Sequence, residues 1–485
     1  MKSIFTKIAL QLAVFSLTAV SLKAQTFTNY HNFAAIKQSL VTFAQTNKDG
    51  GNAYATMIIS GNSLYGTTAS GGTNGLGALF RINTDGTGFT NIFNFTFIKG
   101  QPTNGDNGSG PLGGLVLSGS TLYGTTREGG LRTNYFGSIF AIQTDGLGFT
   151  NLHYFSTVIS NKNSEGASPS AGLTLVGNTL YGVAYNGGIY TDGTIFAMNT
   201  NGTGFTNLYN FDFTNGANPD APLCFASNRL YGTTYLGGAY SNGVVFAVNT
   251  NGTGFTNYHS FSALGYPYSV NDDGANSQSP LVASGNILYG AAARGGSTGN
   301  GYGTLFSIHT DGSDFSPVYY FDYYHGAGPL CQLLITNNLL YGTTSEGGSN
   351  VAGTVFSFNP ASSVYSDLYN FPIGTYSGSA YTNSTGFEPW AGVVMSGNTL
   401  FGVTPTGGPG GSGTIYALIL GGAVPVPLKT QINGTSLALS WSDASYTLQA
   451  AGSLSVSSFT NVPGATSPYT VVTTNSQQFF RLQAN

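Results

Sequence analysis

The chain has 485 residues, of which 7% are charged and 13% aromatic, and 71 residues are glycine. Intrinsic disorder goes with high charge and few aromatics, so this composition excludes it. The abundance of glycine argues against a helical protein. With 14 Lys and Arg against 18 Asp and Glu, the chain lacks the basic surface that a nucleic-acid backbone requires. We therefore expect a folded protein without helical bundles and without a nucleic-acid partner.

The first residues have the pattern of a secretory signal. Lys2 and Lys7 precede an apolar stretch at 8–22, and Ala24 provides a small residue before Gln25. We predict a signal peptide over residues 1–24 and an exported bacterial protein, extracellular or at the cell surface. Removal of the signal peptide leaves 11 basic and 18 acidic residues, a net charge of −7. No later stretch is apolar for long enough to span a membrane.

A repeat of about sixty residues fills most of the chain. Each copy contains a Leu-Tyr-Gly triplet, or Leu-Phe-Gly in the last copy, followed by a Gly-Gly pair and then by Gly-x-x-Phe or Gly-x-x-Tyr. One copy shows four strand-like runs, at 171–176, 179–184, 193–198 and 204–211, joined by Gly and Asn turns. Four antiparallel strands at this period predict a β-propeller blade. The seven triplets start at Leu64, Leu122, Leu180, Leu230, Leu288, Leu340 and Leu400.

The seventh copy lacks its fourth strand, and a matching Phe-Thr-Asn element lies at Phe27–Phe33. An N-terminal strand that completes the last blade would leave no open sheet edge. We therefore predict an all-β fold in which residues 25–420 form a seven-bladed β-propeller closed by this strand. Cys224 and Cys331 fall in non-adjacent repeats, so we expect two small buried apolar residues and no disulfide.

The pattern Leu-Tyr-Gly-Thr-Thr-x-x-Gly-Gly, followed by Gly-Thr-x-Phe, resembles the GloVer (choice-of-anchor) tandem repeat of exported bacterial proteins. The resemblance covers residues 27–420 and implies a surface-associated protein whose C-terminal attachment device differs between members. It implies no activity and no catalytic residues.

Beyond the repeats the sequence changes character. Residues 421–429 read as a linker, and residues 430–485 contain about five short strand-like runs. We predict a small C-terminal β module, a candidate for sorting or attachment. A module of this size buries little core by itself.

One polar residue precedes a glycine in every inter-blade loop, and two interpretations are open. The side chain either caps a turn or joins a polar collar around the channel mouth. Carboxylates spread around a wide ring make a poor metal site, so we expect no metal and no cofactor. The recurring Asp85, Asp145 and Asp311 fit hairpin-turn geometry. The collar candidates are Asp49, Asn107, Glu165, Asn215, Asp273, His325 and Thr385.

Histidines and aromatics complete the candidates. His31, His153 and His259 share a strand position that is Phe or Tyr in other copies, which favours aromatic packing over catalysis. Tyrosines in the inter-blade loops suit the faces of sugars, unless they pack between blades. We name no catalytic residue. The candidate ligand-binding residues are Tyr185, Tyr235, Tyr323, Tyr324, His325, Glu165, Asp273, Glu388 and Trp390.

Three functions remain open. The first is a non-enzymatic, monomeric propeller that presents its inter-blade loops to a glycan or a surface protein. The second is a secreted carbohydrate-active hydrolase or lyase, which requires a carboxylate pair, or a Tyr with His or Arg, in one cleft. The third is a structural spacer. An aromatic surface without such a pair would favour the binder.

Overall fold

The computed structural model describes residues 25–38, 45–96, 107–129, 136–156, 158, 160, 162–297, 299–376, 378, 380–421, 429–433, 436–440, 446–451, 460–472 and 479–484. The predicted signal peptide and most of the predicted linker lie outside them. Phe27–Ile419 form one compact unit, and the described residues of Leu420–Asn485 belong to a second. The described residues contain no helix of the length and apolarity that a membrane crossing requires.

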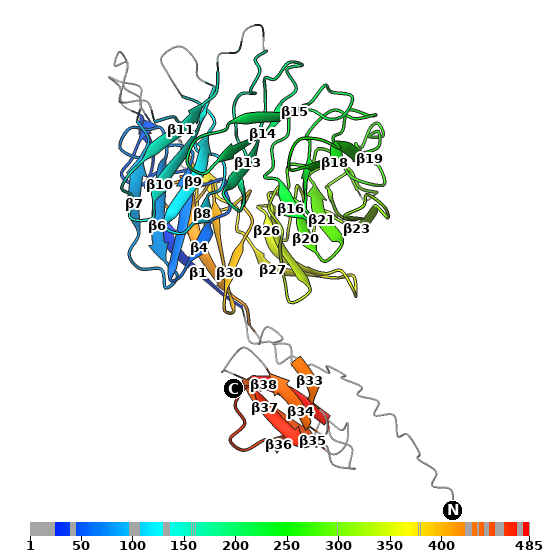
Figure 1. Cartoon of the computed structure of the whole chain (residues 1–485). Coiled ribbons are helices and arrows are strands. Elements are labelled where there is room, and N and C mark those ends of the chain that lie inside the picture. The colour runs from blue at the N-terminus through cyan, green and yellow to red at the C-terminus, as the bar shows by residue number, and fades with distance from the viewer. Residues whose placement is uncertain are drawn as a thin grey trace, which may run out of the picture. The chain divides into compact units, whose positions relative to one another are not determined.

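Seven four-stranded antiparallel sheets make up the first unit, which confirms the all-β, seven-bladed propeller (Figure 1). In chain order their strands are β4 Ile58–Ser60, β5 Ser63–Thr68, β6 Ala78–Asn83 and β7 Thr90–Asn94 in blade 1; β8 Val116–Ser118, β9 Thr121–Thr126, β10 Ser138–Gln143 and β11 Thr150–Tyr154 in blade 2; β12 Thr174–Val176, β13 Thr179–Ala184, β14 Thr194–Asn199 and β15 Thr206–Asn210 in blade 3; β16 Cys224–Ala226, β17 Arg229–Thr233, β18 Val244–Asn249 and β19 Thr256–Ser260 in blade 4; β20 Val282–Ser284, β21 Ile287–Ala292, β22 Thr304–His309 and β23 Ser316–Tyr320 in blade 5; β24 Leu334–Thr336, β25 Leu339–Thr344, β26 Thr354–Asn359 and β27 Val364–Asn370 in blade 6; and β30 Val394–Ser396, β31 Thr399–Thr404, β32 Thr414–Ile419 and β1 Thr26–Asn32 in blade 7.

The first strand of each blade lies nearest the axis. First strands of neighbouring blades lie close together, as β8 and β12, β16 and β20, and β30 and β4 do. The fourth strand is therefore the outer one, and in blade 7 this place belongs to β1, which pairs with β32. Two short hairpins interrupt the loops between blades: β2 Lys37–Gln38 with β3 Gln45–Thr46, and β28 Thr375–Tyr376 with β29 Tyr381–Thr382.

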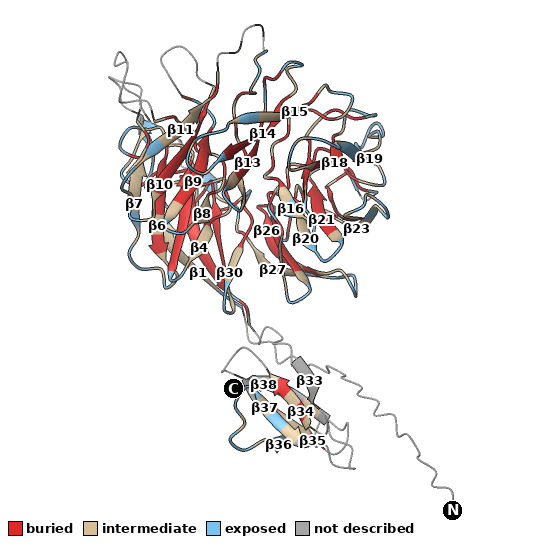
Figure 2. Cartoon of the chain, in the orientation of Figure 1, coloured by how far each residue is buried: buried red, intermediate tan, exposed pale blue. Residues whose placement is uncertain are grey.

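The glycine of the Leu-Tyr-Gly triplet makes room for the aromatic of the next strand. In blade 3, Gly182 pairs with Phe196 across β13 and β14. A Cβ at Gly182 would lie 2.4 Å from Cζ of Phe196, too close for any side chain. Phe196 is fully buried, and Figure 2 shows this burial along the middle strands of the blades. The repeat motif thus encodes the core of each blade.

Two threonines often follow the Leu-Tyr-Gly triplet, and their hydroxyl groups form different hydrogen bonds. Oγ1 of Thr343 donates to the carbonyl of Ala391 in the next blade at 2.8 Å. Oγ1 of Thr344 instead accepts from the N–H of Thr354 in its own blade at 3.1 Å. The first threonine therefore joins neighbouring blades near the axis, and the second fixes the strand hairpin.

Stacked rings join neighbouring blades at the outer strand. At each of the seven interfaces the two ring centroids lie 3.5–4.3 Å apart and the planes are within 12° of parallel. Three of these rings are His31, His153 and His259, which confirms their packing role. The pairs are His31–Phe89, Phe93–Phe149, His153–Phe205, Tyr209–Phe255, His259–Phe315, Tyr319–Tyr365 and Tyr369–Phe27.

The second unit contains two three-stranded sheets around a small core. Leu437, Leu439 and Leu448 are buried there. The sheets consist of β33 Lys429–Asn433, β34 Ser436–Ser440 and β37 Tyr469–Val472, and of β36 Thr460–Asn461, β35 Tyr446–Ala451 and β38 Phe479–Ala484.

Both cysteines are free of disulfides. Cys331 is buried as expected, whereas Cys224 is only partly buried. Burial raises the pKa of the Cys224 thiol to about 11, so this thiol stays protonated at neutral pH.

Candidate functional site

One residue from each blade contributes to a ring around the axis, which we call the axial ring. Each member lies four residues before the first strand of its blade. The residue two positions earlier has a left-handed backbone in every blade, with φ between 53° and 61°. In five blades a proline lies between the two and packs against a glycine of the preceding blade, as Pro219 does on Gly193. The axial ring consists of Tyr54, Leu112, Ser170, Asp220, Gln278, Leu330 and Trp390.

Polar side chains from three neighbouring blades meet in one arc of this ring. Nε2 of Gln278 donates to Asp220 at 2.9 Å, and Oγ of Ser170 donates to the other carboxylate oxygen. Burial raises the pKa of Asp220, although these two hydrogen bonds and nearby Arg127 oppose the shift. The arc is therefore a hydrogen-bonded polar cluster built around one partly buried carboxyl group.

Two tyrosines predicted as ligand contacts lie beside this polar arc. Tyr185 directly follows the second strand of blade 3, and Tyr235 lies two residues after the end of the second strand of blade 4. Burial raises the pKa of Tyr185, and the nearby Asp220 and Tyr235 raise it further while Arg127 lowers it. The amide of Asn218 donates to the carbonyl of Tyr185 at 3.0 Å, which joins blades 3 and 4 at this point.

Aromatic side chains occupy another arc. The rings of Trp390 and Tyr54, from blades 7 and 1, have centroids 5.2 Å apart. Trp390 remains 45% exposed, so its ring is open to a ligand. Glu388 lies two residues before Trp390, and burial, followed by nearby Glu346, raises the pKa of its carboxyl group. Burial and Glu388 also raise the pKa of Tyr54.

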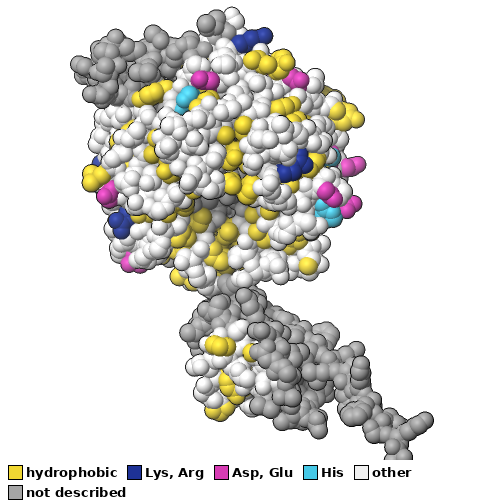
Figure 3. All heavy atoms as spheres, in the orientation of Figure 1, with side chains coloured by type: hydrophobic (Ala, Val, Ile, Leu, Met, Phe, Trp, Pro, Cys, Tyr) yellow, Lys and Arg dark blue, Asp and Glu magenta, His cyan; other side chains and the backbone are white. Residues whose placement is uncertain are grey.

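Charge is sparse on the propeller surface. In Figure 3 the Lys, Arg, Asp and Glu side chains are few and most of the visible face is uncharged. The described residues contain no group of three or more His, Cys, Asp and Glu that could hold a metal ion. The axial ring itself presents hydrogen-bonding side chains at Asp220 and aromatic rings at Trp390.

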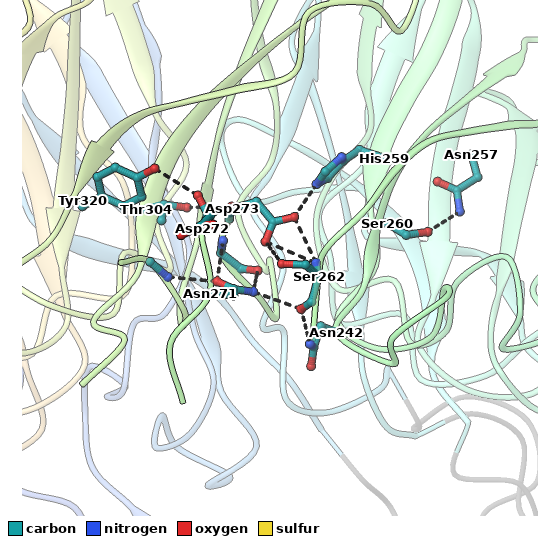
Figure 4. A network of polar contacts seen from close by, with 12 residues as sticks. Asn242, Asn257, His259, Ser260, Ser262, Asn271, Asp272, Asp273, Thr304 and Tyr320 are labelled. Atoms are coloured by element: carbon teal, nitrogen blue, oxygen red, sulfur yellow. Dashed lines mark hydrogen bonds and ion pairs between the residues drawn. The ribbon is translucent and has the colours of Figure 1, made fainter. Parts of the chain in front are cut away.

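Of the two interpretations of the inter-blade polar residues, the polar collar is wrong for Asp49, Glu165 and Asp273, whose carboxylates face the outer strands. Asp273 accepts a 2.8 Å hydrogen bond from His259 and a 3.0 Å bond from the N–H of Ser262, both at the end of blade 4 (Figure 4). Burial opposes the ionisation of Asp273, but the bonds from His259 and Ser262 outweigh it and hold its pKa below the ordinary value.

The same geometry recurs at two other interfaces. Asp49 contacts His31 at 3.0 Å, and Glu165 contacts His153 at 3.4 Å. The interpretation as capped turns is thus confirmed for these three carboxylates. A ligand-binding role for Glu165 and Asp273 stays a prediction.

An asparagine two residues earlier completes the turn. In Figure 4, Asn271 donates to the carbonyls of Ser262 at 3.0 Å and Gly274 at 2.7 Å. Its Oδ1 accepts from the N–H groups of Gly274 and Gly296. Asn47, Asn163 and Asn383 make equivalent bonds in other blades. The sequence Asn-x-x-Gly is thus the signature of the turn.

The predicted residues of the loop between blades 5 and 6 lie together. Nδ1 of His325 lies 2.9 Å from Asp322, and Tyr365 donates to the His325 carbonyl at 2.6 Å. The ring of Tyr323 lies 5.0 Å from that of Tyr302, whereas Tyr324 is 80% exposed. His325 therefore belongs to another capped turn, and Tyr324 is free for contact.

Most aromatic side chains of the inter-blade loops are exposed, so the alternative that they pack between blades is wrong for them. Tyr266 is 100% exposed, and Tyr268, Tyr376, Tyr381 and Trp390 are 45–60% exposed. The hairpin aspartates do follow the expected turn geometry: Asp85, Asp145 and Asp311 each accept a 2.9 Å bond from the N–H two residues later.

Comparisons with known proteins agree with the repeat. Three overlapping segments, residues 154–301, 265–385 and 302–454, match a family model described as the Gloeobacter/Verrucomicrobia repeat, which confirms the resemblance seen in the sequence. None of the curated proteins matches.

The chain is also similar, at low identity, to several solved structures. A GH74 xyloglucanase from Xanthomonas campestris is 12% identical, with 86% of this chain and 60% of that chain covered and a TM-score of 0.48. An oligogalacturonate lyase from Vibrio parahaemolyticus is 8% identical, with 82% and 97% covered and a TM-score of 0.45.

Proposed function

The chain belongs to the Gloeobacter/Verrucomicrobia repeat family, and we propose that it is an exported, non-enzymatic propeller that binds a glycan at its axial ring. One observation carries this proposal: a hydrogen-bonded arc at Asp220 and an aromatic arc at Trp390 belong to the same ring. A sugar presents hydroxyl groups at its edge and apolar C–H groups on its faces, and it needs both kinds of contact.

Binding of neutral glycans to the purified chain tests the proposal. An array of neutral glycans selects a ligand, and calorimetry then measures its affinity for the chain and for the variants Trp390→Ala and Asp220→Ala. We expect each substitution to weaken binding by at least about tenfold, as loss of one stacked ring or one charge-assisted bond does. Tyr266→Ala, a fully exposed tyrosine in another loop, is the control and should bind normally.

A carbohydrate-active enzyme is the second candidate, and one observation favours it. The carboxyl group of Asp220 has a raised pKa and lies near Tyr185 and Arg127, so it could exchange a proton with a substrate while the Arg127 guanidinium stabilises negative charge. Product analysis after incubation with each glycan that binds separates the two candidates. Cleavage that disappears in Asp220→Asn would make the protein an enzyme, and binding without products would support the binder.

Export and surface attachment belong to the same proposal. They are supported by the basic and apolar pattern of residues 1–24 and by the separate compact unit that includes Leu420–Asn485. Cell fractionation tests both. We expect the full chain on the cell surface, and release into the medium when residues 430–485 are deleted. If no glycan binds, a surface protein partner or a spacer role becomes the better account.

A further inference from the structure

The loop that leads to Trp390 carries an additional hairpin, β28–β29, found between blades 6 and 7. The base of the hairpin is fixed to the propeller by Asn383. Its amide donates to the carbonyl of Pro372 at 2.8 Å, and its Oδ1 accepts from the N–H of Gly408 in blade 7 at 3.0 Å. The hairpin therefore has a defined position on the loops of blade 7.

Aromatic rings continue from this hairpin toward the axial ring. Tyr376 and Tyr381 have ring centroids 5.1 Å apart, and the rings of Tyr381 and the buried Phe387 are nearly perpendicular, with centroids 6.3 Å apart. Trp390, three residues further on, contacts Tyr54. A three-residue segment spans at most about 10 Å, so the backbones of Phe387 and Trp390 lie within about that distance of each other. Both pairs are open to solvent, since Tyr376, Tyr381 and Trp390 are 60%, 54% and 45% exposed.

The surface beside the hairpin lacks bulky side chains. Residues 407–413 of blade 7 include five glycines. A Cβ at Gly411 would lie 2.5 Å from Cβ of Ala380 in the hairpin, so glycine is what lets the hairpin approach. Tyr376 and Tyr381 therefore lie beside a glycine-rich surface without bulky side chains, and they are not enclosed in a packed interface.

Two carboxyl groups lie near this path. Glu388 lies between Phe387 and Trp390, and Glu346 is close enough to raise its pKa. Carboxylates accept hydrogen bonds from hydroxyl groups and repel anions. A ligand on this path should therefore be rich in hydroxyl groups and free of negative charge.

We propose that Tyr376 and Tyr381 form a second sugar platform, so that the ligand is a neutral glycan chain that runs from the axial ring to the hairpin. This inference rests on the proposed function of the axial ring. A single sugar covers one aromatic pair, and only a chain reaches both. Affinity should therefore increase with the length of the glycan.

Calorimetry with a length series tests the inference on the full chain. The probes are neutral hexose oligomers, from disaccharide to hexasaccharide, of the linkage that the array selects. For Tyr376→Ala/Tyr381→Ala we expect at least a tenfold loss of affinity for the hexasaccharide and an unchanged affinity for the disaccharide. Trp390→Ala should weaken the binding of both. Tyr376→Phe/Tyr381→Phe, which keeps the rings, should retain most of the affinity.

A matched control comes from the loop between blades 4 and 5. Tyr266 and Tyr268 are 100% and 60% exposed, and Tyr266→Ala/Tyr268→Ala should bind the whole series normally. Hexasaccharide binding that is unchanged in the hairpin variant, or reduced equally in the control, would overturn the inference while the axial site stands. If no oligomer of any length binds, the proposed function and the inference fail together.

Discussion

Nε2 of Gln278 donates a 2.9 Å hydrogen bond to the carboxylate of Asp220, and this bond joins blades 4 and 5 at the axial ring. With the bond from Ser170, it holds a carboxyl group that burial disfavours in its charged form. A buried carboxyl group of this kind lowers the stability of the fold, and an uncharged residue would be more stable at this position. Such groups are therefore typical of functional sites.

Asp220→Asn should therefore stabilise the fold and weaken glycan binding. The folded pKa of Asp220 is raised, so its contribution to stability is fully present below the ordinary value of 3.8 and is lost as pH rises through the folded pKa. At pH 7 we expect the variant to melt about 2 °C higher than the natural chain, and at pH 4 by less. Thermal unfolding at both pH values measures this, and a variant that melts lower at pH 7 would contradict it.

Asp273→Asn should have the opposite effect on stability. The hydrogen bonds from His259 and Ser262 depress the folded pKa of Asp273 despite its burial, so its contribution is present above 3.8 and is lost as pH falls through the folded pKa. We expect a loss of about 1–2 kcal/mol in the free energy of unfolding at pH 7, and a smaller loss near pH 3.

Urea denaturation at the two pH values measures the effect of Asp273→Asn. Asp85→Asn serves as the control, because Asn201 accepts the same turn hydrogen bond in blade 3. Equal losses for Asp273→Asn at pH 7 and pH 3 would show that its charge is irrelevant.

Gly182→Ala should destabilise blade 3. The new methyl group would lie 2.4 Å from the ring of Phe196, and overpacking of this kind costs about 1–3 kcal/mol. Combining it with Phe196→Leu should cost less than the sum of the two single changes, because the smaller side chain makes room. Simple additivity in denaturant unfolding would show that the two side chains do not compete for space.

Tyr416→Phe should make the protein more stable. The other six blades have phenylalanine at this position, and the buried Tyr416 hydroxyl finds no hydrogen-bond partner among the described residues. Removing an unsatisfied hydroxyl should increase the free energy of unfolding by about 1 kcal/mol. Tyr231→Phe is the matched control and should be destabilising, since the Tyr231 hydroxyl donates to the Thr310 carbonyl at 2.9 Å. A higher free energy of unfolding in both variants, or in neither, would contradict this explanation.

The repeat pattern was sufficient to predict the blades, because each motif residue acts within its own blade or on the next one. The Gly182–Phe196 contact and the His153–Phe205 stack both recur at the same repeat positions in the other blades. The recurrence of a polar residue in the inter-blade loops left two interpretations of Asp49 and Asp273 open. A polar residue in every blade suggests a ring, but spacing cannot show whether its side chain faces the axis or the outer strand.

The axial polar arc was missed for a related reason. Ser170, Asp220 and Gln278 belong to different residue types, so no motif marks them, while Trp390 at the same repeat position was conspicuous. The available signal was the position itself, four residues before each first strand and usually after a proline. A comparison of this position across the seven repeats would have placed Asp220 and Trp390 in the same ring.

The central claim is that the axial ring binds a neutral glycan. Calorimetric titration of the chain with the neutral glycan that an array selects, repeated on Trp390→Ala and on the exposed control Tyr266→Ala, tests it most directly. We predict that Trp390→Ala loses at least about tenfold in affinity and that Tyr266→Ala binds like the natural chain. Equal binding by all three proteins, or binding by none of them, would contradict the claim.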